Sequence, residues 1–147
     1  MKNKYWIMIV VLGGLLSAFS SCKKEDIKVS GKEAEGTFTA FEITMDGKTT
    51  PMPTEDESMK IKVTVVDATK AEVILSLTTK DKTDQTPPIS CSIKKDPDGF
   101  TYLTDIETGK ELVLYYDKNT IDCFVPDGKG TTVSASRNGK KPDWWDD

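Results

Sequence analysis

The chain of 147 residues contains no histidine, only three cysteines, and more acids than bases. Without histidine it lacks the commonest general base and the commonest metal ligand, which excludes every catalytic triad built on that residue. Its formal net charge of -4 provides no basic footprint, so we expect no nucleic-acid partner. The length fits one domain, because domains usually run to about 100–200 residues.

Long hydrophobic runs are also scarce, and the one that exists lies at the amino terminus. It extends without charge from Tyr5 to Phe19, after two early lysines. This is shorter than the roughly 20 apolar residues that a helix needs to cross a bilayer. A positive start, a short apolar run and small residues at its end are typical of an export signal. We therefore interpret residues 1–21 as a signal peptide.

The end of that signal carries a recognisable motif. Phe19-Ser20-Ser21-Cys22 resembles a bacterial lipobox. The resemblance implies cleavage before Cys22, lipidation of its thiol, and anchoring of the domain to a membrane by acyl chains. The following segment, residues 22–26, is similar to the start of mature lipoproteins from Bacteroidetes-type bacteria. That similarity implies the outer membrane, on its periplasmic face or at the cell surface. An ordinary secretory signal with an incidental cysteine is the alternative.

Beyond the signal, the pattern changes twice. Residues 22–35 are mostly charged and small with no hydrophobic period, which predicts a lipidated flexible tether. From residue 36, apolar and polar residues alternate, and this period of two is typical of strands with one buried face. Asp-Gly and Asn-Gly dipeptides divide the runs. The sequence predicts eight strands, over residues 37–45, 59–66, 71–79, 89–95, 99–105, 111–116, 120–125 and 131–137.

These strands predict an all-β domain over residues 36–138, followed by a tail over residues 139–147. A bulge near Ala40 would reconcile the two parities found in the first strand. Gly36-Thr37-Phe38 resembles the first strand of small lipocalin-like lipoproteins, in which Gly-x-Trp begins the barrel and Phe38 here takes the tryptophan's place. The resemblance implies a single eight-stranded antiparallel lipocalin-like barrel. A flattened barrel or sandwich fits nearly the same pattern.

Two cysteines, Cys91 and Cys123, fall at inward-facing positions of predicted strands. Disulfides form in exported proteins, so the compartment favours a bond between them. Two buried free thiols that pack as small hydrophobic side chains are the alternative.

Catalytic and metal-binding motifs are missing. Asp96-Pro97-Asp98-Gly99 with Glu107 imitates a calcium loop, but no oxygen ligand stands at its fifth position and no glycine at its sixth. We interpret it as a hairpin turn, and Glu55-Asp56-Glu57 as a solvated acidic run. No nucleophile elbow or phosphate-binding loop occurs. We expect no catalytic residue, no metal and no cofactor, and therefore no enzyme.

Four aromatic residues on adjacent predicted strands are candidates for recognition: Phe100, Tyr102, Tyr115 and Tyr116. They could line a barrel mouth and hold a small apolar ligand, although such residues also fill cores. On this basis we expect a non-enzymatic binding module.

The tail ends with Trp144 and Trp145, which should not stand free in water. They could pack against the domain itself, or dock a partner protein or a sugar, because tryptophan combines a large apolar area with a hydrogen-bond donor. The alternative function is therefore a structural or adaptor lipoprotein that contacts an envelope protein complex through an edge strand and this tail.

Overall fold

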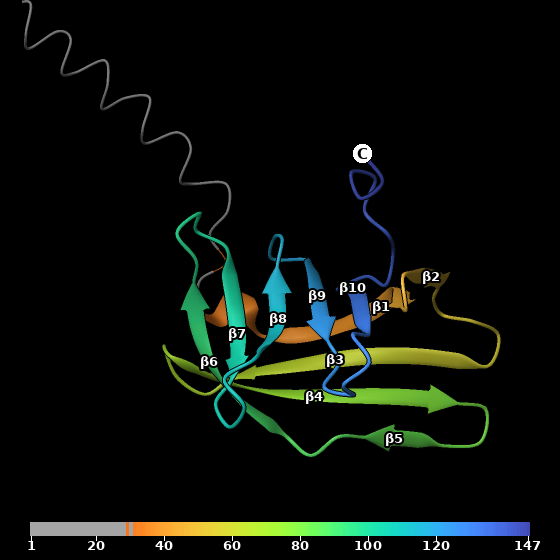
Figure 1. Cartoon of the computed structure of the whole chain (residues 1–147), viewed down its shortest axis with the longest axis horizontal. Coiled ribbons are helices and arrows are strands. Elements are labelled where there is room, and N and C mark those ends of the chain that lie inside the picture. Colours follow the sequence, from red (N-terminus) through yellow and green to blue (C-terminus); the bar gives the residue numbers. More distant parts are fainter. Residues whose placement is uncertain (1–28, 30) are drawn as a thin grey trace, which may run out of the picture.

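The computed structural model describes Val29 and residues 31–147. The predicted signal peptide and Cys22, the predicted lipidation site, lie outside the described residues. In the described part, one short 3-10 helix precedes the strands, and no helix is long and apolar enough to cross a membrane (Figure 1). The elements are η1 (Gly31–Ala34), β1 (Gly36–Met45), β2 (Lys48–Pro51), β3 (Glu57–Val65), β4 (Lys70–Thr79), β5 (Thr83–Gln85), β6 (Ile89–Lys95), β7 (Thr101–Asp105), β8 (Glu111–Tyr115), β9 (Thr120–Phe124) and β10 (Thr132–Ser136).

Eight of these strands form a closed antiparallel barrel. Their order follows the chain, β1-β3-β4-β6-β7-β8-β9-β10, and β10 pairs with β1 to complete the ring. This is an up-and-down barrel, the architecture that also occurs in lipocalins. The predicted all-β barrel is therefore confirmed, and the sandwich is not.

The eight predicted strands are the eight strands of the ring, with small differences at their ends. Two short strands, β2 and β5, were not predicted. β2 pairs with the end of β1, and β5 pairs with the end of β4. Both are fully exposed, so neither carries an apolar alternation that a sequence pattern could reveal. The turn before β2 is tight, because Asp46 and Gly47 have φ angles of 50° and 75°.

The predicted bulge in β1 is also present. The register between β1 and β10 shifts between Ala40 and Glu42. Before the shift, Phe38 and Ala40 are buried, and after it Ile43 stands opposite the buried Val133. The bulge therefore keeps the inner face apolar on both sides of the shift.

The barrel interior is filled by its own side chains, as expected for eight strands, whose ring is just wide enough for them. Among the described residues, no buried side-chain nitrogen or oxygen lacks a hydrogen-bond partner. The largest side chains with almost no exposure are Tyr115, Phe38, Ile61, Leu103, Ile121, Val63, Val73, Val113 and Val133.

One end of the barrel is closed by the segment that precedes β1, and we call it the sealed end. The Tyr115 hydroxyl donates a hydrogen bond of 2.7 Å to the carbonyl of Ala34, and the Thr101 hydroxyl donates one of 2.8 Å to the carbonyl of Val29. Val29 and Ala34 are both buried. The prediction of a flexible tether up to residue 35 is wrong for these residues, because side chains of β7 and β8 hold their backbone in the core.

Arg137, just after β10, completes the sealed end. Its guanidinium carbon lies 4.7 Å from the centre of the Phe38 ring, and the same group donates hydrogen bonds to the carbonyls of Glu33, Glu35 and Lys118. Gly36 makes room for it: a β-carbon there would lie 2.0 Å from Arg137 Nη1. Gly36 also has a φ angle of 154°, which L side chains rarely adopt. The sealed end thus ties the last strand to the segment that precedes the first.

Candidate functional site

The opposite end, which we call the mouth, is formed by three connections. They are the segment before β6, the β7–β8 loop and the β9–β10 loop, which lie on the same side of the barrel (Figure 1). Two hollows, of about 420 and about 510 Å³, lie between them and share Asp105 and Pro126 at their border. We call these two adjoining hollows the depression, and each of them has a size that small-molecule sites commonly have.

Apolar groups dominate this depression. Ile106 is 51% exposed, although a large aliphatic side chain is normally buried. The Asp105 carboxylate is already occupied, because it accepts hydrogen bonds from the Glu107 amide and the Thr108 hydroxyl. The apolar side chains along the depression are those of Pro87, Pro88, Ile89, Ile106, Leu112, Phe124, Val125 and Pro126. Such a surface can hold an apolar molecule.

Further apolar residues extend the inner face of the sheet beyond the packed core at this end. Met59 and Leu77 are paired across β3 and β4, two positions beyond the buried pair Ile61 and Leu75, and therefore lie on the same face. Leu77 is 36% exposed, and Met45 at the end of β1 is 51% exposed. Leu77 and Met45 therefore add exposed apolar side chains to Ile106 at the mouth.

The four aromatic residues predicted to line a mouth do not come together. Tyr115 is buried in the core and bonded to the sealed end. Tyr102 stands opposite Leu114, on the other face from the buried pair Leu103 and Val113. Tyr116 contacts the tail tryptophans on the outer wall, and Phe100 belongs to the turn between β6 and β7, where its amide bonds to Asp96. The strands that carry Tyr102 and Tyr115, β7 and β8, are neighbours as expected. Tyr115 and Tyr116 nevertheless point to opposite faces of the sheet, because successive side chains of a strand alternate.

The residues that do line the mouth carried little signal in the sequence. Pro87, Pro88 and Ile106 lie in connections, where no periodicity distinguishes an exposed apolar side chain from a buried one. Their signal is compositional: Ile106, Val125 and three prolines stand in connections that are otherwise polar.

Cys91 and Cys123 are free thiols in the structure, so the predicted disulfide is not formed. They lie on β6 and β9, which β7 and β8 separate in the ring, and both are fully buried. Burial raises the pKa of Cys91 to about 11, with the Asp105 carboxylate adding to the effect, and raises that of Cys123 to about 12. The alternative of two small packed side chains is the one observed.

The tail folds back on the outer wall of the barrel. The Trp145 ring makes edge-on contacts with Phe41 and Tyr116, at centroid distances of 5.1 and 5.2 Å. Its Nε1 donates a hydrogen bond of 2.7 Å to Glu42 Oε1. Lys141 lies 3.4 Å from Glu42 and 2.6 Å from Asp146, and the hydrogen bond to Asp146 is the main reason that its pKa is raised. Trp145 therefore packs against the chain's own wall, and Phe41 is buried beneath it.

A polar network lies on the same wall. Asp122 accepts hydrogen bonds from the Tyr116 hydroxyl at 2.7 Å and from the Ser134 hydroxyl at 2.6 Å. Burial, followed by the hydrogen bond to Asp122, raises the pKa of Tyr116 above its usual value. These hydrogen bonds fix the aromatic ring of Tyr116, on which the tail tryptophans pack.

Over Val29 and residues 31–147, no cluster of three or more metal-ligating side chains occurs. No family model, no curated protein and no solved structure matches the chain. The class of the protein, an up-and-down β-barrel with a sealed end and an open apolar mouth, is therefore defined by its own geometry.

Proposed function

We propose that this protein is a lipid-anchored, non-enzymatic binding module of the outer membrane, and that it holds a small apolar ligand at the barrel mouth. The observation that carries the proposal is the apolar depression between the three mouth loops, with Ile106 exposed in it. Small-molecule sites are concave and mostly apolar, and barrel mouths are among the places where they occur. Because side chains fill the barrel interior, we expect the ligand at the rim of the barrel and not at its centre.

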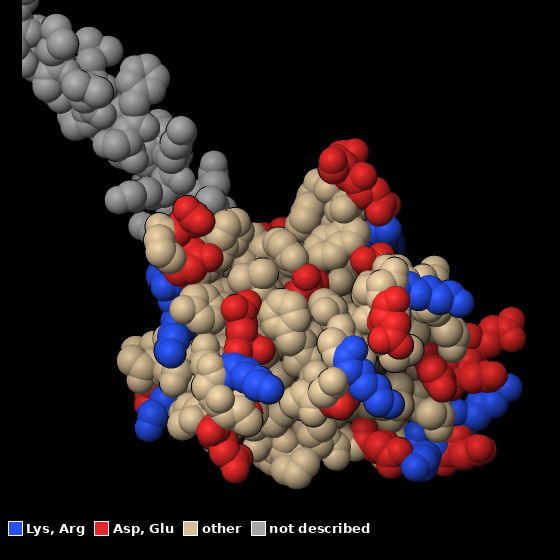
Figure 2. All heavy atoms as spheres, in the orientation of Figure 1, with Lys and Arg blue, Asp and Glu red and all other residues tan. Residues whose placement is uncertain are grey.

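The orientation of the barrel supports this arrangement. The described chain begins at the sealed end, where Val29 is bound by Thr101. If acyl chains on Cys22 anchor the protein, the sealed end stands on the side of the anchor and the mouth points away from it. A ligand could then enter from the aqueous compartment without crossing the tether. Figure 2 shows charged side chains of both signs on the visible face, as expected for a domain that itself stays in water.

Photocrosslinking tests the proposal on the full chain in a polyoxyethylene detergent. The probe is palmitate that carries a diazirine, and peptide mass spectrometry locates the adducts. We expect adducts over residues 86–90, 105–112 and 124–130, because these line the depression. Labelling spread evenly over the exposed apolar residues would contradict the proposal.

A matched pair of variants sharpens the test. Ile106→Asp places a charge in the depression, whereas Val66→Asp places one at a residue that is 59% exposed in the β3–β4 turn, near the sealed end. We expect the mouth adducts to fall about tenfold in the first variant and to be unchanged in the second. Equal losses in both variants would show that the label reports general hydrophobicity.

The adaptor role is a second candidate, because β2 and β5 are exposed strands that each pair on one side only, with β1 and β4. An extended segment of another protein could pair with such an edge. Against this role, β2 contains Lys48 and Pro51, which are residues that protect edges from pairing. If in-cell crosslinking from residues 48–51 or 83–85 traps one envelope protein while the mouth stays unlabelled by palmitate, the adaptor role replaces the binding module.

A further inference from the structure

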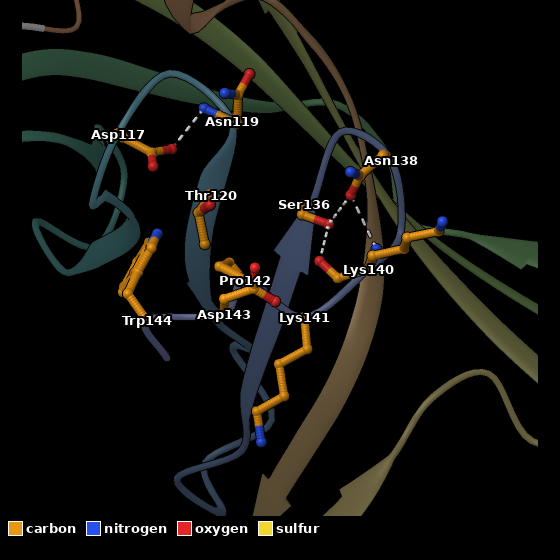
Figure 3. A pocket seen from close by; sticks show the side chains of 10 residues that line it. All are labelled: Asp117, Asn119, Thr120, Ser136, Asn138, Lys140, Lys141, Pro142, Asp143 and Trp144. Carbon is orange, nitrogen blue, oxygen red and sulfur yellow. Dashed lines mark hydrogen bonds between the residues drawn. The ribbon is translucent and has the colours of Figure 1, made fainter. Parts of the chain in front are cut away.

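A separate hollow of about 310 Å³ lies on the outer wall at the sealed end (Figure 3). It lies between the β8–β9 loop, the end of β10 and the tail. Figure 3 shows Trp144 and Asp117 on one side, Asn138 and Lys140 on the other, and Pro142 with Asp143 between them. The lining residues are Asp117, Asn119, Thr120, Ser136, Asn138, Lys140, Lys141, Pro142, Asp143 and Trp144. None of them belongs to the mouth.

Trp144 gives this hollow an aromatic surface. Its side chain is 47% exposed, although its ring contacts Tyr116 and Trp145 at centroid distances of 6.2 and 5.6 Å. Trp145 is itself bonded to Glu42, so the tail is held in place before any ligand arrives. A ring that is fixed in advance loses little conformational entropy when a ligand packs against it.

The polar residues around the ring divide into a fixed set and an available set. The Ser136 hydroxyl lies within hydrogen-bond distance of Asn138 Oδ1 and the Lys140 carbonyl. The Asp117 carboxylate accepts a hydrogen bond from the backbone N–H of Asn119. These contacts shape the floor and the loop. The side-chain amide of Asn119, the ammonium of Lys140 and the carboxylate of Asp143 make no hydrogen bond or ion pair within the described chain. The three side chains are exposed and available to a ligand.

The hollow carries charges of both signs. Asp117 and Asp143 contribute two negative charges, Lys140 contributes a free positive charge, and Lys141 is paired with Glu42 and Asp146. A phosphate or another anion would meet both carboxylates, and a simple cation would meet Lys140. A neutral molecule that both donates and accepts hydrogen bonds meets no such repulsion, because carboxylates accept, ammonium groups donate and amides do both.

We propose that this hollow is a binding site for a neutral carbohydrate. A sugar ring presents C–H groups on one face, which suit the Trp144 ring, and hydroxyls around its edge, which suit Asn119, Lys140 and Asp143. The volume fits the end of a short oligosaccharide and not a long buried chain. This site is independent of the apolar ligand proposed for the mouth, so either assignment can fail without the other.

Isothermal titration calorimetry tests the site with cellotriose, maltotriose and tri-N-acetylchitotriose as neutral probes, and with glucose 6-phosphate as a charged comparison. The full chain is kept in a polyoxyethylene detergent, because an alkyl glycoside would itself compete for the site. We expect saturable binding of at least one neutral sugar and weaker binding of the phosphorylated one. The absence of saturable binding by all three neutral sugars, or tighter binding of glucose 6-phosphate, would overturn the proposal.

Variants assign the binding to the hollow. We expect Trp144→Ala to weaken binding about tenfold or more, and Trp144→Phe to retain most of it. Asn119→Ala, whose side chain is exposed, should also weaken binding without affecting the fold, as thermal unfolding would verify. Ile106→Asp at the mouth should bind the sugar like the unchanged chain. Binding that is insensitive to both Trp144→Ala and Asn119→Ala would place the sugar elsewhere and overturn the assignment.

Discussion

The two ends of the barrel are built from the same eight strands but are finished in different ways. At the sealed end, side chains from β7, β8 and the segment after β10 bind backbone carbonyls of residues 29–35, over a core that includes Phe38 and Tyr115. At the mouth, loops bind mainly to themselves, as Asp105 does with Glu107 and Thr108, and apolar side chains stay exposed. The difference teaches that contacts between distant segments fix the sealed end, whereas local hydrogen bonds shape the mouth loops.

The largest expected effect comes from removing one phenylalanine at each end. Phe38→Ala empties a fully buried position beneath Arg137, and we expect it to lower the free energy of unfolding by about 3–5 kcal/mol. Phe124→Ala at the mouth, where the ring is only partly buried, should cost about 1 kcal/mol. Urea unfolding measures both values. Equal losses would break the contrast between the ends.

A matched pair of threonines gives the next effect. Thr101→Val leaves the buried carbonyl of Val29 without its donor and should cost about 1–3 kcal/mol. Thr108→Val removes an exposed hydroxyl that donates to Asp105, and should change stability by no more than about 0.5 kcal/mol. Urea midpoints of the two variants, measured side by side, make the comparison. A larger loss for Thr108→Val would contradict it.

Alkaline pH should weaken the core without a mutation. The pKa values of Cys91 and Cys123 are raised from 9.0 to about 11 and about 12, and burial also raises that of Tyr115. Above about pH 9 the unfolded chain loses protons that the folded chain retains, so stability falls as pH rises, and it is fully present below that pH. Urea midpoints between about pH 7 and about pH 11 measure the slope.

The double variant Cys91→Ala and Cys123→Ala is the control for this pH dependence. We expect it to lower stability at every pH, because the loss of each buried sulfur leaves space in the core. The slope above about pH 9 should become shallower, since two of the titrating groups are gone. A midpoint that stays constant or rises in the unchanged chain would show that these groups titrate normally.

The last prediction concerns the reactivity of the two buried thiols and involves no change in stability. In the folded chain at neutral pH, Cys91 and Cys123 should not react with N-ethylmaleimide, because both are buried and protonated. In denaturant without a reductant, both should react. Intact mass also reports the state of Cys22, which stays unlabelled if it carries a lipid. Failure of Cys91 and Cys123 to react after denaturation, with reaction restored by a reductant, would reveal a disulfide.

The strands of the ring were predictable because alternation is a local property. The run from Met59 to Val65 reveals its buried face without knowledge of its neighbours, and the bulge at Ala40 follows from a change of parity. β2 and β5 were not predictable, because strands held only by a hairpin partner need no apolar face. The sealed end depends on contacts between distant residues, although Arg137, the single arginine of the chain, was a signal that could have been followed.

The sites were less predictable than the fold. Four aromatic residues were predicted to bind a ligand because of their residue type alone. Tyr115 instead lies in the core and Tyr116 on the outer wall, because successive residues of a strand point in opposite directions. Of the two tail tryptophans, Trp145 packs against the wall, whereas Trp144 stays 47% exposed. The partners of Trp145, Phe41 and Glu42, lie on the first strand of the barrel, and only the closed ring brings them to the tail.

The pairing of β1 with β10 also governs when the protein can fold. The first strand cannot gain its last partner until the carboxy-terminal strand has been synthesised, and Arg137 cannot cap η1 before then. Pairings between distant parts of a chain slow folding, because loop entropy is lost before the contacts form. A barrel that closes through the two ends of its own sequence can therefore complete its ring only after β10 has been synthesised.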